Sequence, residues 1–256
     1  MTDNLFEAWL ESLERRHLAD LQFSEVTRAL RSLSADYVQR RSSGRSSAAV
    51  RGSALEGRGK RAAFALFYGP LHFLVVARIV AALGVRLRAD RLVDLGCGTG
   101  AAGAALAIAA GGVTEIVGVD RERWALREAE LTYRHFSLRC RTVHASVQRA
   151  RIPRGAAVLA AYAINELDDA GRTRLQETLT SAVRAGSALL VVEPIARTVA
   201  PWWRAWDSAF RPFGARSDEW RFSDPLPERV RAFDKAAGLD HREQTARSLW
   251  VPESLS

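Results

Sequence analysis

The sequence predicts an α/β protein in which a doubly wound parallel sheet is joined to a helical cap at the N-terminus. From residue 91 onward, short apolar runs alternate with longer segments of helical period, the pattern of repeated strand and helix units. The apolar run at 91–95 leads into glycines at positions 96, 98 and 100 and then into small residues, as a buried strand leads through a tight turn into a closely packed helix. Residues 1–61 show helical patterns followed by a basic stretch rich in serine and glycine. We therefore expect a cap and linker in residues 1–61 and the sheet domain in residues 62–256.

The first 61 residues divide into a helical part and a basic part. Apolar residues recur at helical spacing over residues 4–18, and a second helix is expected from about residue 23. Residues 40–61 then carry seven basic residues against one acid, Glu56, among serines and glycines. We interpret this segment as a flexible linker, with a basic arm that touches phosphate or closes over a site as the alternative.

The remaining elements follow in regular order. Residues 62–83 are expected to form a helix pair or one helix broken at Gly69 and Pro70. After them the pattern predicts six strands, at 91–95, 114–119, 139–144, 156–163, 187–193 and 245–251. Helices are expected between them, at 99–110, 122–136, 169–184, 198–211 and 226–237. Residues 218–227 are interpreted as a loop. In such a sheet, ligands bind at the carboxyl ends of the strands.

Composition excludes several classes of protein. The 37 basic and 29 acidic residues give a net charge of +8, which favours a polyanionic partner such as RNA. Two cysteines, Cys97 and Cys140, are too few for a metal cluster or a disulfide framework, so we expect no metal site and a cytoplasmic protein. No signal peptide is evident, and the most apolar stretch, 62–84, is interrupted by polar residues, which argues against a membrane span.

The glycine turn is compatible with two cofactors. Gly96, Gly98 and Ala101 match the spacing of dinucleotide-binding turns, and Asp120 ends the next strand at the expected interval. Asp94, however, lies two residues before the first glycine, where its charge would repel a pyrophosphate. S-adenosylmethionine (SAM) has no phosphate, and its ammonium group and ribose hydroxyls suit two carboxylates. An NAD-dependent dehydrogenase remains an alternative, disfavoured by Asp94 and by the lack of an evident Tyr-x-x-x-Lys pair.

These residues resemble the class I SAM-dependent methyltransferase family, whose first motif is an acid followed by G-x-G-x-G and whose second strand ends in an acid. The resemblance implies a Rossmann-like sheet and SAM as the cofactor. Ser146 or Gln148 is expected near the adenine, as the polar group that follows strand three. The cofactor-binding residues that we expect are Asp94, Gly96, Cys97, Gly98, Gly100, Asp120, Arg121, Ser146 and Ala163.

The end of strand four is the expected catalytic position. Asn165 could orient an acceptor nitrogen, and Glu166 could accept its proton or bind an amine. The alternatives are that Asn165 only caps the following helix and that Glu166 pairs with an arginine. His144 is either a general base or a structural residue.

Four residues are expected on the acceptor side: Tyr68 before the sheet, Glu193 after strand five, Trp203 on the next helix and Trp220 in the late loop. Trp202 and Trp206, four residues apart, are expected to pack that helix on the sheet, whereas Trp203 could stack on an aromatic acceptor.

Several short motifs, in order, are similar to the small-ribosomal-subunit methyltransferase-like family of mitochondria and bacteria. They are Tyr68-Gly69-Pro70, Asn165-Glu166-Leu167, Glu193-Pro194 and residues 219–227. The resemblance implies association with ribosomal RNA or the ribosome. That family carries a metal-binding cysteine cluster near the late loop, which this chain lacks, so its acceptor could differ. The open functions are methylation of RNA, methylation of a small molecule or peptide, and a catalytically silent, SAM-binding role in ribosome assembly.

Overall fold

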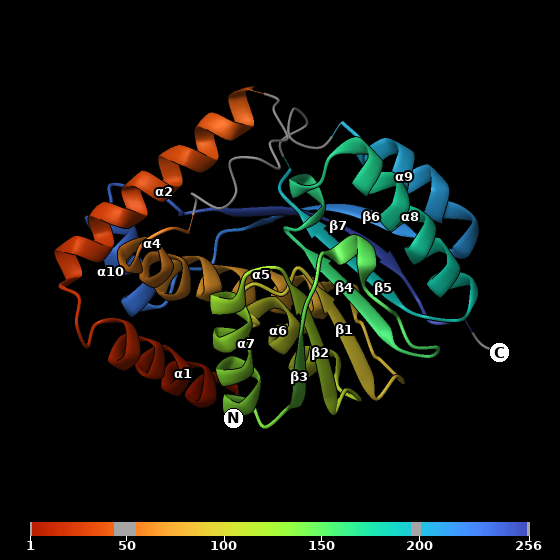
Figure 1. Ribbon diagram of the computed structural model, residues 1–256, viewed down its shortest axis with the longest axis horizontal. Coiled ribbons are helices and arrows are strands. Elements are labelled where there is room, and N and C mark those ends of the chain that lie inside the picture. Colours follow the sequence, from red (N-terminus) through yellow and green to blue (C-terminus); the bar gives the residue numbers. More distant parts are fainter. Residues whose placement is uncertain (1, 44–54, 196–200, 255–256) are drawn as a thin grey trace.

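A computed structural model describes residues 2–43, 55–195 and 201–254, and its centre is a seven-stranded sheet of order β3-β2-β1-β4-β5-β7-β6 (Figure 1). The first five strands pair in parallel, which confirms the Rossmann-like prediction. The sheet is nevertheless mixed, because β7 runs antiparallel to both β5 and β6. The strands are β1 (Arg91–Leu95), β2 (Glu115–Asp120), β3 (Arg139–His144), β4 (Ala157–Ala161), β5 (Leu189–Glu193), β6 (Arg216–Phe222) and β7 (Gln244–Val251).

Successive residues of the central strands point to opposite faces and build two apolar clusters. In β1, Leu92 packs into the cluster formed with helices α5, α6, α7 and α10, whereas Val93 and Leu95 pack into the one formed with α8 and α9. Figure 1 shows α8 and α9 on one side of the sheet and α6 and α7 on the other. These helices are α5 (Gly69–Leu83), α6 (Ala101–Ala110), α7 (Arg123–His135), α8 (Asp169–Arg184), α9 (Trp203–Phe210) and α10 (Glu228–Ala236).

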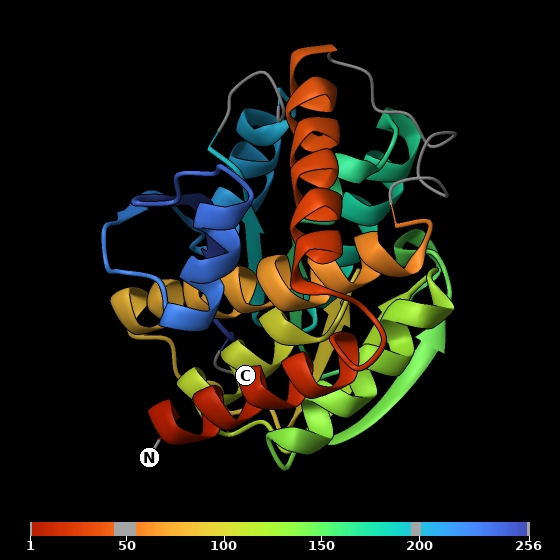
Figure 2. The same cartoon turned by 90° about the vertical axis from the view of Figure 1, so that its left-hand side faces the viewer.

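The two N-terminal helices, α1 (Thr2–His17) and α2 (Phe23–Ser43), pack on the same face of the sheet as α6 and α7. Trp9 of α1 is buried and lies 5.6 Å from the ring of Phe73 and 5.7 Å from that of Phe136. Figure 2 shows α1 lying against α7 and α2 standing upright above α1. The cap therefore shares the core of the sheet domain.

One unbroken helical segment connects the cap to the sheet. It consists of α4 (Arg58–Ala63), the π-helical turn η2 (Phe64–Tyr68) and α5. We expected a break at Gly69 and Pro70, but the helix continues with one wide turn before them. Pro70 has no N–H to donate to the residue four earlier, and a π turn accommodates that missing bond without ending the helix.

This helical segment bears on two sequence predictions, the boundary between cap and sheet domain and the argument against a membrane span. The expected boundary between residues 61 and 62 falls inside the helix, and residues 58–61 of the expected linker are helical, while 44–54 lie outside the described residues. Residues 58–83 are also long and apolar enough to cross a membrane, by length and composition alone, with half of the most apolar window buried inside the protein.

The segment 218–222, expected in a loop, lies instead in the edge strand β6. From Ser217 on, its residues alternate between exposed and half-buried, and Arg216, Glu219 and Arg221 are exposed, so no continuous apolar run marks it in the sequence. Trp220 on this strand donates from Nε1 to Ser248 Oγ at 2.8 Å and stacks on Phe222.

Candidate active site

A cavity of about 830 Å³ opens at the carboxyl ends of the parallel strands. Its floor is formed by the glycine turn after β1 and by the ends of β2, β4 and β5. Its other walls come from α2, η2, α5 and the start of β7. The volume lies near the upper end of the range of about 300–1,000 Å³ found for small-molecule sites. The cavity therefore has room for a cofactor and for part of a second molecule.

The glycine turn folds tightly against neighbouring strands. Gly96 and Cys97 both donate their N–H groups to Val119 O, at 2.8 and 3.1 Å. A Cβ added to Gly96, whose φ is +70°, would lie 2.5 Å from the Cβ of Ala163. Glycine is thus required both by the backbone conformation and by the close approach of the chain after β4. Cys97, Gly98 and Ala163 line the cavity with Gly96, whereas Gly100 is not among the lining residues and packs against Ala129 and Tyr133 of α7.

Asp94 lies beneath the turn and outside the residues that line the cavity, with 1% of its surface exposed. Its Oδ2 accepts a hydrogen bond from Tyr133 Oη at 2.8 Å, and the Gly103 N–H in α6 also donates to it. Burial raises the pKa of Asp94 to about 7. The carboxyl group fixes α6 and α7 against the turn, so any contact with a ligand would be indirect.

Asp120 lies at the end of β2 and lines the cavity. Its Oδ2 accepts the N–H of Gly98 at 3.0 Å, and its Oδ1 accepts the N–H of Glu122 at 2.9 Å. The carboxylate is therefore fixed between the glycine turn and the start of α7, with its remaining lone pairs available to accept from two neighbouring hydroxyls. Ser146 and Gln148 line the same cavity beyond the end of β3 and hydrogen-bond to each other.

These residues fit SAM. Gly96 and Gly98 leave the turn without side chains where a ligand must approach the backbone. Asp120 presents a carboxylate for the ribose hydroxyls, and the polar pair Ser146 and Gln148 lies at the next strand end for the adenine. No lysine or arginine lies in the glycine turn, as a pyrophosphate would favour.

The comparisons with known proteins identify the same segment. The methyltransferase domain family matches residues 92–186, which run from β1 to the end of α8. Together with the fold and the residues around the glycine turn, this match supports a SAM-dependent methyltransferase. No curated protein matches its sequence.

Solved structures of methyltransferases resemble this one only distantly. A putative RNA methyltransferase of Pyrococcus horikoshii shares 13% identity over 72% of this chain and 83% of its own, with a TM-score of 0.48. A SAM-dependent O-methyltransferase of Thermotoga maritima shares 18% identity over 72% and 66%, with a TM-score of 0.47. The magnesium protoporphyrin IX methyltransferase of Synechocystis PCC 6803 shares 14% over 77% and 83%, also at 0.47.

In the methyltransferase, Asn165 lies after the end of β4 and is hydrogen-bonded to the end of β5 and to the residue before α9. Its Nδ2 donates to Glu193 Oε2 at 2.6 Å, and its Oδ1 accepts from Trp202 Nε1 at 3.0 Å. Glu193, at the end of β5, also accepts the N–H groups of Ile164 and Asn165 through Oε1. Burial raises the pKa of Glu193 to about 8. The two residues line the cavity as expected, but as one hydrogen-bonded unit.

Glu166 lies at the cavity wall beside Arg121, with 3.4 Å between its Oε2 and Arg121 Nη2. Its side chain is half exposed, so this ion pair is weak and can rearrange. The expected pairing with an arginine is thus present, and Glu166 can still reach a ligand in the cavity. Asp168, three residues after Asn165, caps α8 by accepting from Gly171 N at 2.7 Å, so Asn165 does not serve as the cap of that helix.

A wall of aromatic rings, which sequence reasoning identified only through Tyr68, faces the strand ends. Phe64, Tyr68 and His72 lie along η2 and α5. The His72 ring stacks on Tyr162 of the β4 turn at 4.0 Å between centroids and 15° between planes. Burial lowers the pKa of His72 to about 3, which leaves a neutral imidazole. The helical spacing of 64, 68 and 72 was visible in the sequence, but it is equally typical of a helix core.

Tyr162 has a backbone conformation that signals a functional site. Its φ is +57°, a left-handed conformation that costs a residue with a side chain about 1–3 kcal/mol. Its N–H donates to Val192 O at 2.8 Å, and this bond together with the His72 stack holds it in place.

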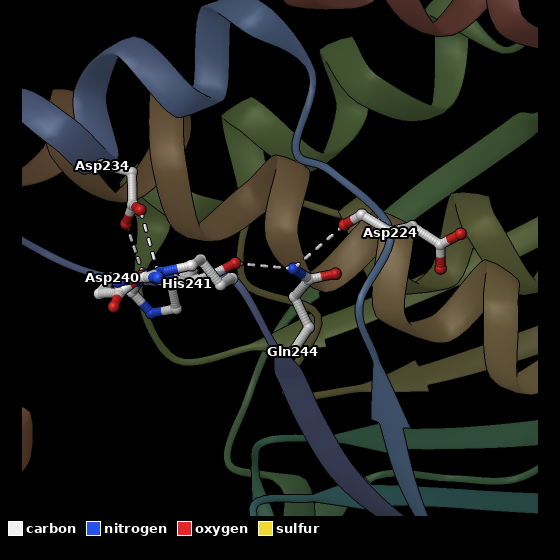
Figure 3. A network of polar contacts seen from close by, with 6 residues as sticks. Asp224, Asp234, Asp240, His241 and Gln244 are labelled. Atoms are coloured by element: carbon white, nitrogen blue, oxygen red, sulfur yellow. Dashed lines mark hydrogen bonds and ion pairs between the residues drawn. The ribbon is translucent and has the colours of Figure 1, made fainter.

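A polar network at the start of β7 closes the far side of the cavity (Figure 3). Asp234 of α10 accepts from His241 through both the backbone N–H, at 3.1 Å, and ring Nδ1, at 2.5 Å. Gln244 Nε2 donates to His241 O at 2.8 Å, and Figure 3 shows Asp224 on the other side of Gln244. His241 and Gln244 line the cavity. The antiparallel course of β7 brings them there, since it begins beyond the carboxyl end of β5.

Three expected site residues lie away from the cavity. Trp203 donates from Nε1 to Ser217 Oγ at 3.1 Å and stacks with Arg247, and Trp220 lies on β6. His144 contacts the backbone oxygen of Arg121 and is exposed. As expected, Trp206 is buried against the sheet, whereas Trp202 lies half-buried beside Asn165. In the part of the chain that the structure describes, no group of three metal-ligating side chains is found.

Proposed function

We propose that this methyltransferase methylates a base of RNA, with ribosomal RNA as the favoured source. The observation that supports it is the set of aromatic rings of Phe64, Tyr68, His72 and Tyr162, which line the same cavity as the glycine turn. Flat rings hold nucleobases by stacking, at about 1–3 kcal/mol per base. The net charge of +8 favours a polyanion over a neutral small molecule. The short motifs shared with the ribosomal family agree with this choice, since Tyr68, Asn165 and Glu193 meet around one cavity.

When bound, SAM supplies a methyl group on a positively charged sulfur, which an acceptor nitrogen or oxygen takes as the carbon–sulfur bond breaks, with loss of a proton from an N–H or O–H acceptor. The aromatic wall aligns the ring of the acceptor against the strand ends, where alignment contributes most to the rate. Glu166 offers a carboxylate at the cavity wall for that proton. The neutral His72 places no charge in the cavity that would oppose a cationic cofactor.

A second function has its own support. Both ends of the Asn165 amide are already bonded, to Glu193 and to Trp202. An acceptor can engage this amide only by displacing one of them, by using its second N–H, or by donating to the second lone pair of Oδ1. A SAM-binding assembly factor that transfers nothing needs no such exchange.

Transfer of a radioactive methyl group tests the proposal directly. Purified protein and labelled SAM are incubated separately with small ribosomal subunits, with deproteinised RNA and with a small-molecule extract, all from cells that lack this protein. We expect label in RNA, and we expect Asn165→Ala to lower the rate at least tenfold with unchanged affinity for SAM. Asn4→Ala, which removes an exposed amide on α1, is the matched control and should transfer like wild type.

Each other outcome contradicts the proposal in a recognisable way. Label only in the extract or in protein identifies another acceptor class. Binding of SAM by calorimetry with no label in any fraction supports the silent assembly factor.

A further inference from the structure

A second, smaller cavity lies outside the active site, between the cap and the start of α7. Its volume is about 160 Å³, and it is lined by Arg16, His17, Leu21, Arg58, Arg61 and Trp124. These residues come from α1, the turn after it, α4 and α7. Three guanidinium groups and an imidazole thus surround a space with a tryptophan in its wall, and none of the described residues that line it is acidic.

The positive charge in this cavity is only partly balanced. Arg16 Nη2 and His17 Nε2 both contact Glu128 Oε2, at 2.9 and 3.2 Å, and these bonds help to lower the pKa of Glu128 below its usual value despite burial. Arg58 pairs with Asp20, but both side chains are mostly exposed, so the pair is weak. Two carboxylates therefore face three arginines, and an excess positive charge remains.

Hydrogen-bond donors in this cavity also lack partners. Arg16 Nε is buried and unpaired among the described residues. Arg61 uses its Nε for Leu55 O at 3.1 Å, and its guanidinium lies 5.8 Å from the centre of the Trp124 ring. Its two terminal nitrogens have no hydrogen-bond partner in the described part of the chain. A buried unpaired donor is costly, and the ligand that satisfies a guanidinium best is an anion with several oxygens.

We propose that this cavity binds a backbone phosphate of the RNA substrate, with Trp124 against the adjoining sugar or base. Its volume suits a single phosphate with part of a nucleotide better than a whole cofactor. An arginine guanidinium can donate two parallel hydrogen bonds to two oxygens of one phosphate, and the tryptophan ring can stack on a base or sugar. This inference rests on the proposed RNA acceptor.

The position of Trp124 connects the two cavities. It lies on the first turn of α7, and Asp120, Arg121, Glu122 and Ala125 around it line the active-site cavity. Arg58 and Arg61 lie on α4, which continues without a break into Phe64 of the aromatic wall. An RNA strand with one base in the active site can thus place a neighbouring phosphate in the basic cavity.

Binding of a fluorescent single-stranded RNA of mixed sequence, measured by anisotropy from 50 to 300 mM KCl, tests the proposal. We expect Arg58→Gln/Arg61→Gln to weaken RNA binding roughly 10- to 100-fold at low salt. The slope of the logarithm of the binding constant against the logarithm of the KCl concentration should become shallower by about 0.7 for each phosphate that is no longer neutralised. Trp124→Ala should weaken RNA binding roughly 5- to 150-fold. Affinity for SAM should not change. The control, Arg174→Gln/Arg204→Gln, removes two exposed arginines from α8 and α9 on the other face of the sheet and should bind much like wild type.

The outcomes separate this inference from the proposed function. If wild type binds RNA and the cavity variant binds it equally well, the phosphate site is refuted while the RNA acceptor stands. If wild type binds SAM but no RNA, the RNA acceptor itself fails. Inorganic phosphate is the third probe: should it bind the cavity tightly and RNA not displace it, the site takes a free anion and the proposal is overturned.

Discussion

Tyr133 donates a hydrogen bond of 2.8 Å to Asp94 in the fully buried layer between β1 and α7. The motif acid of this methyltransferase is therefore bonded to the scaffold, with the glycine turn above it. A Cβ on Gly103 of α6 would lie 2.2 Å from Asp94 Oδ2, so the helix can approach only because residue 103 is glycine. The acid and the small residues after the turn form one packing unit.

The buried Asp94 predicts that stability falls as the pH rises. Burial raises its pKa from 3.8 to about 7, so between these values the unfolded chain releases a proton that the folded protein keeps. The free energy of unfolding should then decrease by up to about 1.4 kcal/mol per pH unit on account of this group. Urea unfolding of Asp94→Asn from pH 4 to 8 should show a shallower decrease than wild type.

Glu193 acts in the same direction, since burial raises its pKa from 4.5 to about 8. Asp94→Asn should therefore reduce the slope without abolishing it. Glu177→Gln, which removes an exposed carboxylate on α8, controls for the loss of a negative charge. An unchanged slope in Asp94→Asn would show that Asp94 is ionised in the folded protein.

Asp120 should determine the affinity for SAM. Its carboxylate holds the Gly98 N–H and faces the cavity, so Asp120→Ala removes both a support of the turn and a hydrogen-bond acceptor. Hydrogen bonds to charged groups contribute about 1.5–3 kcal/mol, which predicts a loss of roughly 10- to 150-fold in affinity by calorimetry. Glu115→Ala, at the opposite end of the same strand and paired with Arg91, should bind SAM like wild type.

Glycine should be favourable at two helix ends where φ is positive, so introducing it at one and removing it at the other should change stability in opposite directions. Ser137 follows α7 with φ +58° and is exposed, so Ser137→Gly should raise the free energy of unfolding by about 0.5–1 kcal/mol. Gly84 follows α5 with φ +62° and open space where a Cβ would lie, so Gly84→Ala should lower it by about 1 kcal/mol. Thermal or urea unfolding measures both, and a change of the same sign in the two variants would contradict the argument.

The N-terminal helix should unfold together with the sheet. Trp9 is 1% exposed between Phe73 and Phe136, and Trp9→Ala should cost about 3–5 kcal/mol in a single cooperative transition. Leu5→Ala, at a 39% exposed position of the same helix, should cost less than about 0.5 kcal/mol. An additional early transition in wild type would show that the cap is a separate unit.

The cofactor half of the site was predictable because it is local. The glycine turn, Asp120 and the strand ends follow from short patterns, since a buried apolar run, a turn and a helix start dictate one geometry. Asp94 was found by its position, but its partner was not, because Tyr133 is 39 residues away and nothing in the sequence pairs the two.

The acceptor half was less predictable because distant segments build it. His72, Tyr162 and His241 meet only in the folded chain, and their spacing is also typical of core residues. The composition of β7 does not indicate that it runs antiparallel to β5. The charged sequence of the edge strand β6 is as typical of a loop as of a strand. The chemistry of Trp203 and Trp220 suits an acceptor site, but it does not specify the face to which their side chains point.

The π turn at 64–68 holds one residue more than a turn of α-helix. Its five residues turn the chain by about as much as four residues of an α-helix do, so α4 and α5 keep nearly the relative orientation of a continuous α-helix. The extra residue is thus absorbed between Phe64 of the active-site wall and the rest of α5. A deletion within α4 or α5 would instead rotate the segments on either side by about 100°. Single deletions should therefore be tolerated better between residues 64 and 68 than in the regular turns on either side.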